Sequence, residues 1–210
     1  MELTSHYSVA VLAFPPDAGY PRLTMAVLAE LDDLLGEVRR SGLFRGAVIA
    51  ANPRSFAIGA CLEEVALVEG VAARDFAQAG QTLFNGIANF PLPVVAAIRG
   101  YCLGGGLDLA LACHARVATY DSSFGHPGTS LGLITGWGGA QRLSRLIGRA
   151  AATQLFLTAE RIPASQALTL GLVDELVPSS DLVEAAARRA LHGTDVRLEN
   201  GRRKLENRGA

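Results

Sequence analysis

The segment that decides the fold of this chain covers residues 93–109 and reads PVVAAIRGYCLGGGLDL. Its residues 94–98 are continuously apolar, which is typical of a strand covered on both faces in a parallel sheet. After a turn, Gly104, Gly105 and Gly106 open a helix that we expect over residues 107–113. The first helical turn leaves backbone N–H groups unpaired at the positive end of the helix dipole, and glycine lets a ligand reach them. The segment predicts a site for an oxygen atom that gains negative charge during a reaction, although close packing of the helix on a sheet would also explain the glycines.

Strands and helices alternate along the rest of the chain. Apolar and β-branched segments predict extended structure at residues 8–14, 47–51, 56–58 and 116–119, and a strand end at residues 172–173. Helical spacing of apolar residues predicts a helix capped by Thr24 that runs to about residue 40, and further helices at residues 74–89, 140–147, 150–157, 164–169 and 181–191. This alternation indicates an α/β protein with a layered core. We expect a core domain over residues 1–180 and a short C-terminal helical tail over residues 181–210.

Composition and charge exclude several function classes. The chain has 210 residues, half of them hydrophobic, and a formal net charge of −1, so it offers no charge pattern for binding nucleic acid. Its three cysteines, Cys61, Cys102 and Cys113, are irregularly spaced, which argues against a disulfide framework and a zinc site. The first residues do not resemble a signal peptide, and no uninterrupted apolar stretch has the length of a bilayer. We therefore expect a soluble, cytoplasmic protein without a metal ion.

Phosphate-binding patterns are absent, and one hydrolase pattern is present only formally. The sequence has neither GxGxxG followed by a suitable acid nor Gly-Lys-Ser/Thr. Residues 128–132, GTSLG, fit the GxSxG nucleophile elbow, and Asp174 and His192 follow Ser130 in the order of a catalytic triad. A helix must follow that serine directly, whereas residues 132–138, GLITGWG, begin a helix poorly. A hydrolase with Ser130 as nucleophile is kept as an alternative.

Five motifs follow one another along the chain. They are residues 56–62, FAIGACL, residues 92–110 around the triple glycine, residues 124–128, FGHPG, residues 136–143, GWGGAQRL, and residues 159–174, AERIPASQALTLGLVD. In this order they resemble the motifs of the crotonase (enoyl-CoA hydratase/isomerase) superfamily, in which residues 92–110 correspond to the central motif and residues 56–62 to the F-x-x-G-A-D loop. On these motifs the chain is identified as a member of the superfamily.

The resemblance implies a crotonase-like (ClpP/crotonase) spiral of ββα units with a truncated C-terminal helical region. It also implies an acyl-CoA thioester as ligand, no cofactor beyond the coenzyme A of the substrate, and a homotrimer or a dimer of trimers. The two backbone amides of the family's oxyanion hole correspond to those of Ala60 and Gly105. The backbone at residues 57–60 would also lie against the adenine of coenzyme A. Further residues expected to contact the substrate are Ala57, Ile58, Gly59, Gly104, Gly128 and Trp137.

The sequence departs from the family at the two glutamates that hydratases use. Asp108 stands at the first position, three residues beyond Gly105, and Gly128 stands at the second. Hydration needs a water to be held and deprotonated while a proton reaches the α-carbon, and a single carboxylate does this poorly. Asp108 lies in the first helical turn, where the dipole favours the ionised form that a base needs. We therefore expect an isomerase- or lyase-type enzyme with Asp108 as its base, and keep a catalytically degenerate acyl-CoA-binding paralogue as the alternative.

Three polar residues near the motifs have both a functional and a structural interpretation. His126 lies in the site loop and titrates near neutrality, so it is a candidate acid or base as well as a hydrogen-bonded loop residue. Glu63 and Glu64 follow Ala60 closely and are candidates for catalysis or for exposed acids at a helix start.

Two further departures concern the reaction and the coenzyme. Naphthoate-synthase relatives also carry glycine at the position of Gly128, but the aspartate that they place seven residues later is Thr135 here. The family's N-R-P loop is replaced by residues 13–23, AFPPDAGYPRL, which lack its arginine and asparagine. Arg22 is the candidate to take over contacts with the phosphates of coenzyme A.

Overall fold

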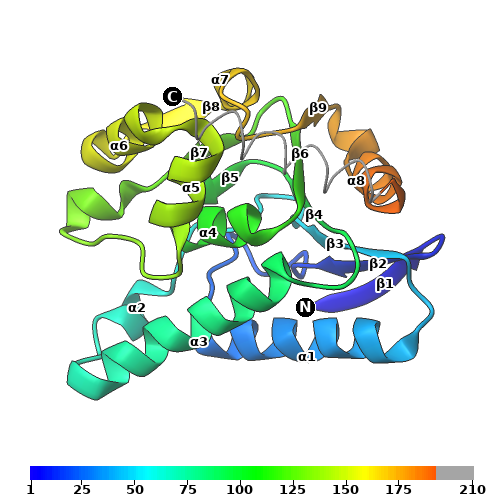
Figure 1. Ribbon diagram of the computed structural model, residues 1–210, viewed down its shortest axis with the longest axis horizontal. Helices are drawn as coiled ribbons and strands as arrows, with labels where there is room; N and C mark the ends of the chain where they lie inside the picture. The colour runs from blue at the N-terminus through cyan, green and yellow to red at the C-terminus, as the bar shows by residue number, and fades with distance from the viewer. Residues whose placement is uncertain (193–210) are drawn as a thin grey trace.

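The computed structural model describes residues 1–192, which form an α/β fold built on a six-stranded sheet (Figure 1). The strands lie in the order β1-β2-β3-β4-β6-β9. Their bounds are β1 Glu2–His6, β2 Val9–Ala13, β3 Gly46–Ala50, β4 Val94–Ile98, β6 Ala115–Thr119 and β9 Glu175–Val177. β1 runs antiparallel to β2, and the other neighbours in this sheet are parallel, which requires crossover connections between them. The predicted α/β class is confirmed.

Helices cover both faces of this sheet. The long helices α1 Met25–Ser41 and α3 Gly70–Ala88 lie together below it in Figure 1, and α8 Leu182–Leu191 packs against β3, β4 and β6. The other helices are α2 Leu62–Val65, α4 Gly105–Ala112, α5 Gly139–Ile147, α6 Arg149–Thr158 and α7 Ala164–Thr169, with short 3-10 helices η1 Pro127–Leu131 and η2 Ser179–Asp181.

Alternate residues of the central strands supply two separate cores. In β3, Ala47 and Ile49 join the core beneath α1, α3 and α4, whereas Val48 and Ala50 join the core beneath α8. Successive side chains of a strand point to opposite faces, so a strand covered on both faces is apolar throughout. α8 lies in the region predicted as a helical tail and packs small alanine side chains on the sheet. The boundary at residue 180 stays a prediction, and residues 193–210 of the predicted tail lie outside the described residues.

A second sheet makes the chain wind as a spiral. It has three strands in the order β5-β7-β8, which are β5 Tyr101–Leu103, β7 Ser123–Gly125 and β8 Arg161–Pro163. Two consecutive units run from the large sheet through the small sheet into a helix, as β4-β5-α4 and then β6-β7-α5. In the preceding unit, the chain passes from β3 to α3, and Ala57 pairs with Cys102 of β5 on the way. These repeats are the ββα units predicted for the fold.

Local sequence signals place some boundaries well and others poorly. The side chain of Thr24 caps α1 by accepting a hydrogen bond from Val27 N (3.1 Å), and Gly42 ends this helix with a left-handed φ of 64°. The strand end predicted at residues 172–173 is wrong, because pairing with β6 begins only at Glu175. Leu172 and Val173 are apolar because they are buried in the core, not because they belong to a strand. The short elements β1, β5, β7, β8 and α2 were not predicted, since segments of three to five residues contain too few periods to detect.

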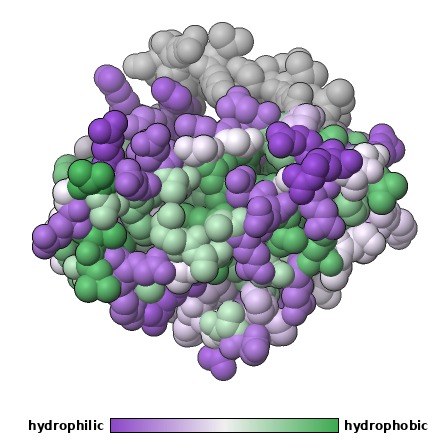
Figure 2. All heavy atoms as spheres, turned by 90° about the horizontal axis from the view of Figure 1, so that it is seen from below, coloured by the Kyte–Doolittle hydropathy of each residue, from purple (hydrophilic) through white to green (hydrophobic). Residues whose placement is uncertain are grey.

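The surface beneath α1 and α3 is mixed in character. Figure 2 shows this face with polar and apolar residues interspersed, so it is not one continuous charged or apolar surface. Within residues 1–192, no helix combines the length and the apolar character that crossing a membrane requires.

Candidate active site

The first turn of α4 packs directly against the loop that precedes α2. Gly104 has a left-handed φ of 50°, and its N–H donates to Gly125 O (2.9 Å). Gly106 must lack a side chain, because a Cβ atom there would collide with the backbone carbonyl of Ala57. A Cβ on Gly59 would lie 3.6 Å from Gly105 N. These close approaches place the predicted site residues of the two segments side by side.

Two backbone amides at this contact have no partner. Leu23 N donates to Gly59 O (2.8 Å) and Cys61 N donates to Leu23 O (3.2 Å), a parallel pairing that directs the Ala60 N–H away from Leu23. A Cβ on Gly105 would lie 3.2 Å from Ala60 N, so the two residues are neighbours. Among residues 1–192, neither Ala60 N nor Gly105 N donates a hydrogen bond. Two adjacent unpaired donors, one of them at a helix N-terminus, can bind one oxygen atom with negative charge.

These amides lie on a cavity of about 610 Å³. Most of the other lining side chains are apolar and come from the α2–α3 region, the loop after β7, and α6. Among the predicted site residues, those that line the cavity are Ile58, Gly59, Ala60, Gly104, Gly105, Gly128 and Trp137. Ala57 lies behind this wall, fully buried, and its carbonyl accepts a hydrogen bond from Leu103 N (2.9 Å).

Trp137 forms the wall next to the start of α4. Its indole packs against Phe76 and Phe84, with ring centroids 5.2 Å and 5.6 Å away, and Nε1–H donates to Phe76 O (3.3 Å). A Cβ on Gly105 would lie only 2.6 Å from the indole ring. Glycine at position 105 therefore leaves room for the ring and for access to the amide.

The predicted base, Asp108, is fully buried and does not line the cavity. The hydroxyl of Thr135, which does line the cavity, donates a hydrogen bond to its Oδ2. Burial raises the pKa of Asp108 to about 6, although Thr135, the charge of Arg142 and nearby backbone amides lower it. Thr135 stands where one branch of the family has aspartate, but its contact with Asp108 could not be read from the sequence, because it depends on how the glycine-rich loop folds back.

His126 lines the cavity and faces Asp108. Its Nε2 lies 3.7 Å from Oδ1 of Asp108, and its ring stacks on Phe156 of α6 with centroids 4.6 Å apart. Burial lowers the pKa of His126 to about 4, so the imidazole is neutral at physiological pH. Phe156 lies outside the five motifs that define the site and was not a predicted site residue, and no local signal marks it.

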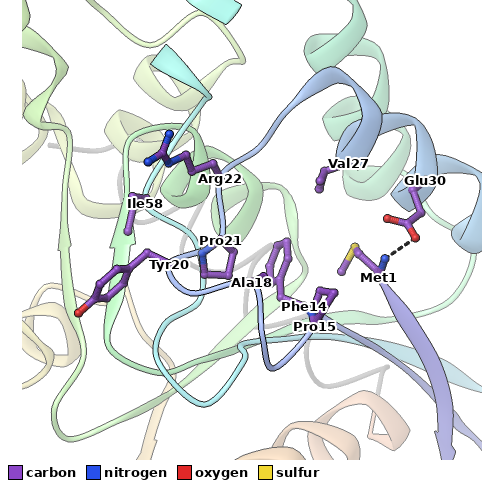
Figure 3. Close-up of a pocket in the computed structure, with 10 residues that line it drawn as sticks. All are labelled: Met1, Phe14, Pro15, Ala18, Tyr20, Pro21, Arg22, Val27, Glu30 and Ile58. Atoms are coloured by element: carbon purple, nitrogen blue, oxygen red, sulfur yellow. Dashed lines mark ion pairs between the residues drawn. The ribbon is translucent and has the colours of Figure 1, made fainter. Parts of the chain in front are cut away.

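Arg22, the candidate phosphate contact, lies where two cavities meet. The replaced loop at residues 13–23 lines a second cavity of about 500 Å³, which shares Arg22 and Ile58 with the first. Figure 3 shows these two residues at one end of the second cavity and Met1 and Glu30, which form an ion pair, at the other. The guanidinium of Arg22 pairs with Glu63 at 2.7 Å. Hydrogen bonds from the backbone and Cys61, and then Arg22, lower the pKa of Glu63 to about 2.

The residues of the formal GxSxG pattern are engaged elsewhere. Ser130 is exposed on η1, and its hydroxyl donates to Pro127 O (2.6 Å). The side chain of Asp174 is buried and pairs with Arg116 at 3.0 Å. No helix follows Ser130 directly, since Gly132 ends η1 with a left-handed φ of 72°. This arrangement is not a nucleophile elbow.

Cysteine and metal chemistry find no support in the described part of the chain. Cys61, Cys102 and Cys113 are free thiols, and burial raises the pKa of Cys113 to about 12. Within residues 1–192, no three His, Cys, Asp or Glu side chains come together as a set that could hold a metal ion.

Comparisons with known proteins agree with this architecture. A family model described as enoyl-CoA hydratase/isomerase matches residues 8–195. The fatty acid oxidation complex subunit alpha of Shewanella halifaxensis is 42% identical over 168 residues, which cover 78% of this chain and 24% of that protein. The chain thus spans about a quarter of the length of this curated relative.

Solved structures match over nearly the whole chain. An enoyl-CoA hydratase from Bacillus anthracis has a TM-score of 0.86 and 32% identity, covering 95% of this chain and 80% of that one. Pseudomonas aeruginosa DspI has a TM-score of 0.82 and 30% identity, covering 94% of this chain and 83% of that one. The crotonase-like fold predicted from the sequence is therefore confirmed.

Proposed function

The chain belongs to the enoyl-CoA hydratase/isomerase family, and from that premise we propose that it binds an acyl-CoA thioester and stabilises the enolate of that thioester. The observation that carries the proposal is the pair of unpaired amides, Ala60 N and Gly105 N, on the wall of a largely apolar cavity. The carbonyl oxygen of a thioester gains negative charge when a proton leaves the α-carbon, and fixed donors stabilise that charge. Loss of one such donor typically costs about 2.7–4 kcal/mol of transition-state stabilisation.

The reaction that we propose is an isomerase-type proton transfer with Asp108 as its base. A proton leaves C2 of a 3-enoyl thioester, the electron pair spreads into the dienolate, and the proton returns at C4, so that the double bond moves into conjugation. A pKa of about 6 suits a group that must take and return a proton near neutral pH. Gly128 offers no side chain to hold a water, which argues against the standard hydratase reaction.

The cavity lining and the relatives support a fatty acyl substrate. Phe76, Leu133 and Ile134 line the cavity with apolar surface that suits an alkyl chain. The relative from Shewanella halifaxensis is named as a subunit of a fatty acid oxidation complex. Ile58 and Arg22 border both cavities, which supports a path for coenzyme A past residues 57–60.

The remaining expectations are part of the same proposal. The coenzyme A of the substrate is the only cofactor-like group that the reaction needs, because proton transfer involves no change of oxidation state. A homotrimer or a dimer of trimers in the cytoplasm, with no nucleic-acid or membrane partner, is the setting that the family resemblance implies.

One observation favours a second candidate, a catalytically degenerate paralogue that binds acyl-CoA thioesters without converting them. Asp108 has no exposed surface and lies behind the wall of the cavity. Gly128 adds no replacement for the missing carboxylate. A chain that keeps the amides of Ala60 and Gly105 but cannot deliver a base to the substrate would still bind the thioester carbonyl.

Incubation with 3-enoyl, 2-enoyl and 3-hydroxyacyl thioesters of coenzyme A in D₂O separates the two candidates. Ultraviolet absorbance follows conjugation of the double bond, and mass spectrometry follows exchange at the α-carbon and uptake of water. The isomerase is supported if the double bond moves without uptake of water. This activity should be lost in Asp108→Ala and kept in the control Asp121→Ala, which lies in the exposed turn after β6. Binding without any exchange supports the paralogue, and absence of binding contradicts both.

A further inference from the structure

His126 is a buried polar side chain for which the proposed reaction has no role so far. It follows β7, is 3% exposed and lines the cavity. Stacking on Phe156 fixes the plane of its ring. Among the described residues, neither Nδ1 nor Nε2 has a hydrogen-bond partner. Because an unpaired buried polar group costs about 1–3 kcal/mol, an imidazole with two unpaired nitrogens is expected to gain partners when a ligand binds.

The position of His126 connects the cavity with the carboxylate behind its wall. Asp108 has no exposed surface, and its Oδ1 faces Nε2 of His126 at 3.7 Å. Thr135 occupies the other carboxylate oxygen. The positive charge of Arg142 lowers the pKa of this carboxylate. The guanidinium of Arg142 itself donates hydrogen bonds to Trp137 O (2.8 Å) and Asn85 Oδ1 (2.7 Å). Among residues 1–192, His126 is therefore the titratable side chain that both lines the cavity and faces Asp108.

We propose that His126 relays the proton between the acyl-CoA substrate and Asp108. The proposal rests on the proposed isomerase-type reaction. In the first step, the α-C–H bond breaks and its electron pair stays in the enolate. Nδ1 of His126 takes the proton, while Nε2 passes its own proton to Oδ1 of Asp108. In the second step, Asp108 returns its proton to Nε2 and Nδ1 delivers a proton to C4. The ring is neutral before and after each step, and one proton has moved from C2 to C4.

The surroundings favour a relay over a protonated histidine. Burial lowers the pKa of His126 and raises that of Asp108, so the proton taken from the substrate is held better on the carboxylate than on the ring. The separation of 3.7 Å must shorten by less than 1 Å to reach hydrogen-bond distance, a change typical of active sites that tighten when a ligand binds.

The test measures α-hydrogen exchange of butanoyl-CoA and octanoyl-CoA in D₂O, together with the affinity for each thioester. His126→Phe keeps the stack on Phe156 and removes both nitrogens. We expect its exchange rate to fall at least about a hundredfold, the lower end for loss of an acid–base group, with affinity retained. Ser130→Ala in the same loop is the control and should exchange like the parent protein.

Chemical rescue distinguishes a relay from a purely structural role. In His126→Ala, added imidazole should restore exchange at least tenfold, and in Asp108→Ala it should not. Unchanged exchange in His126→Phe overturns the relay and leaves the proposed function standing. Equal rescue of both alanine variants, or rescue of neither, also overturns the relay. If the parent protein exchanges the α-hydrogen of neither thioester and also shifts no double bond, the result contradicts the proposed function and, with it, the relay.

Discussion

Replacing Asp108 by asparagine should make the protein more stable while it loses proton transfer. Asparagine has nearly the same shape, and its carbonyl oxygen can still accept the hydrogen bond from the Thr135 hydroxyl. What changes is the charge, because the carboxylate must be ionised at neutral pH in a place without exposed surface. Burying an ionised carboxylate is unfavourable, so its removal should raise the free energy of unfolding.

The magnitude follows from the pKa of Asp108, which rises from 3.8 to about 6 on folding. The folded protein binds this proton more tightly than the unfolded chain does, so the stability of the parent protein falls as pH rises from about 4 to 6. At about 1.36 kcal/mol for each pKa unit, the cost reaches roughly 1.5 kcal/mol at pH 5 and roughly 3 kcal/mol at pH 7. The asparagine of the variant has no proton to bind, so the variant avoids this cost.

Urea denaturation of the parent protein and Asp108→Asn at pH 5, 6, 7 and 8 measures the effect. The advantage of the variant should grow with pH and level off above pH 7. His126, whose pKa is lowered on folding, makes the free energy of unfolding depend on pH in the opposite direction. This contribution is present in both proteins, so it cancels in the difference between their free energies of unfolding. A variant that is less stable than the parent at pH 7, or an advantage independent of pH, would refute the assignment of Asp108 as a carboxylate that is ionised at an energetic cost in a buried place.

Three other substitutions test separate parts of the structure. Gly105→Ala places a Cβ 2.6 Å from the Trp137 ring and 3.2 Å from Ala60 N, so it displaces the ring and obstructs the thioester oxygen, and α-hydrogen exchange should fall about 10²- to 10³-fold. Gly86→Ala in open space on α3 is the control, and equal exchange rates in the two variants would contradict a site at Gly105. Asp174→Ala leaves the charge of Arg116 buried and should cost about 3–5 kcal/mol in denaturant melts, whereas a loss below about 1 kcal/mol would show that the pair is dispensable. Ser130→Ala should keep the full rate of α-hydrogen exchange. The parent protein should also resist labelling by an organophosphonate, and labelling of Ser130 would support the hydrolase alternative instead.

Sequence reasoning succeeded where the determinant is local. The side chain of Thr24 sets the start of α1, and the backbone freedom of Gly42 sets its end. The continuous apolar run of β4 reflects burial of that strand on both faces. The triple glycine likewise predicts an open helix start, and α4 begins at Gly105, whose neighbour in space is Ala60. Such features depend on a few adjacent residues, so they can be read without the tertiary structure.

The arrangement around the carboxylate could not be predicted in the same way. Asp108 lies in the first turn of α4, a position that suggests access to a ligand, yet the loop with Thr135 and the residue His126 enclose it. Phe156, which orients His126, comes from a helix whose approach depends on packing. Contacts between segments that meet only through tertiary packing leave no mark on local periodicity.

Trp137 gives the molecule a built-in optical reporter at the oxyanion amides. It is the single tryptophan of the chain, the residue is 3% exposed, and its ring adjoins Gly105 at the wall of the cavity. Intrinsic fluorescence excited at this indole therefore comes from one place, with no second emitter to dilute the signal. A thioester that enters the cavity should alter its quantum yield, and unfolding should shift its emission to longer wavelength as water reaches the ring. Ligand titrations and melting curves can thus be recorded on the same unlabelled sample, at the atoms that the proposed chemistry uses.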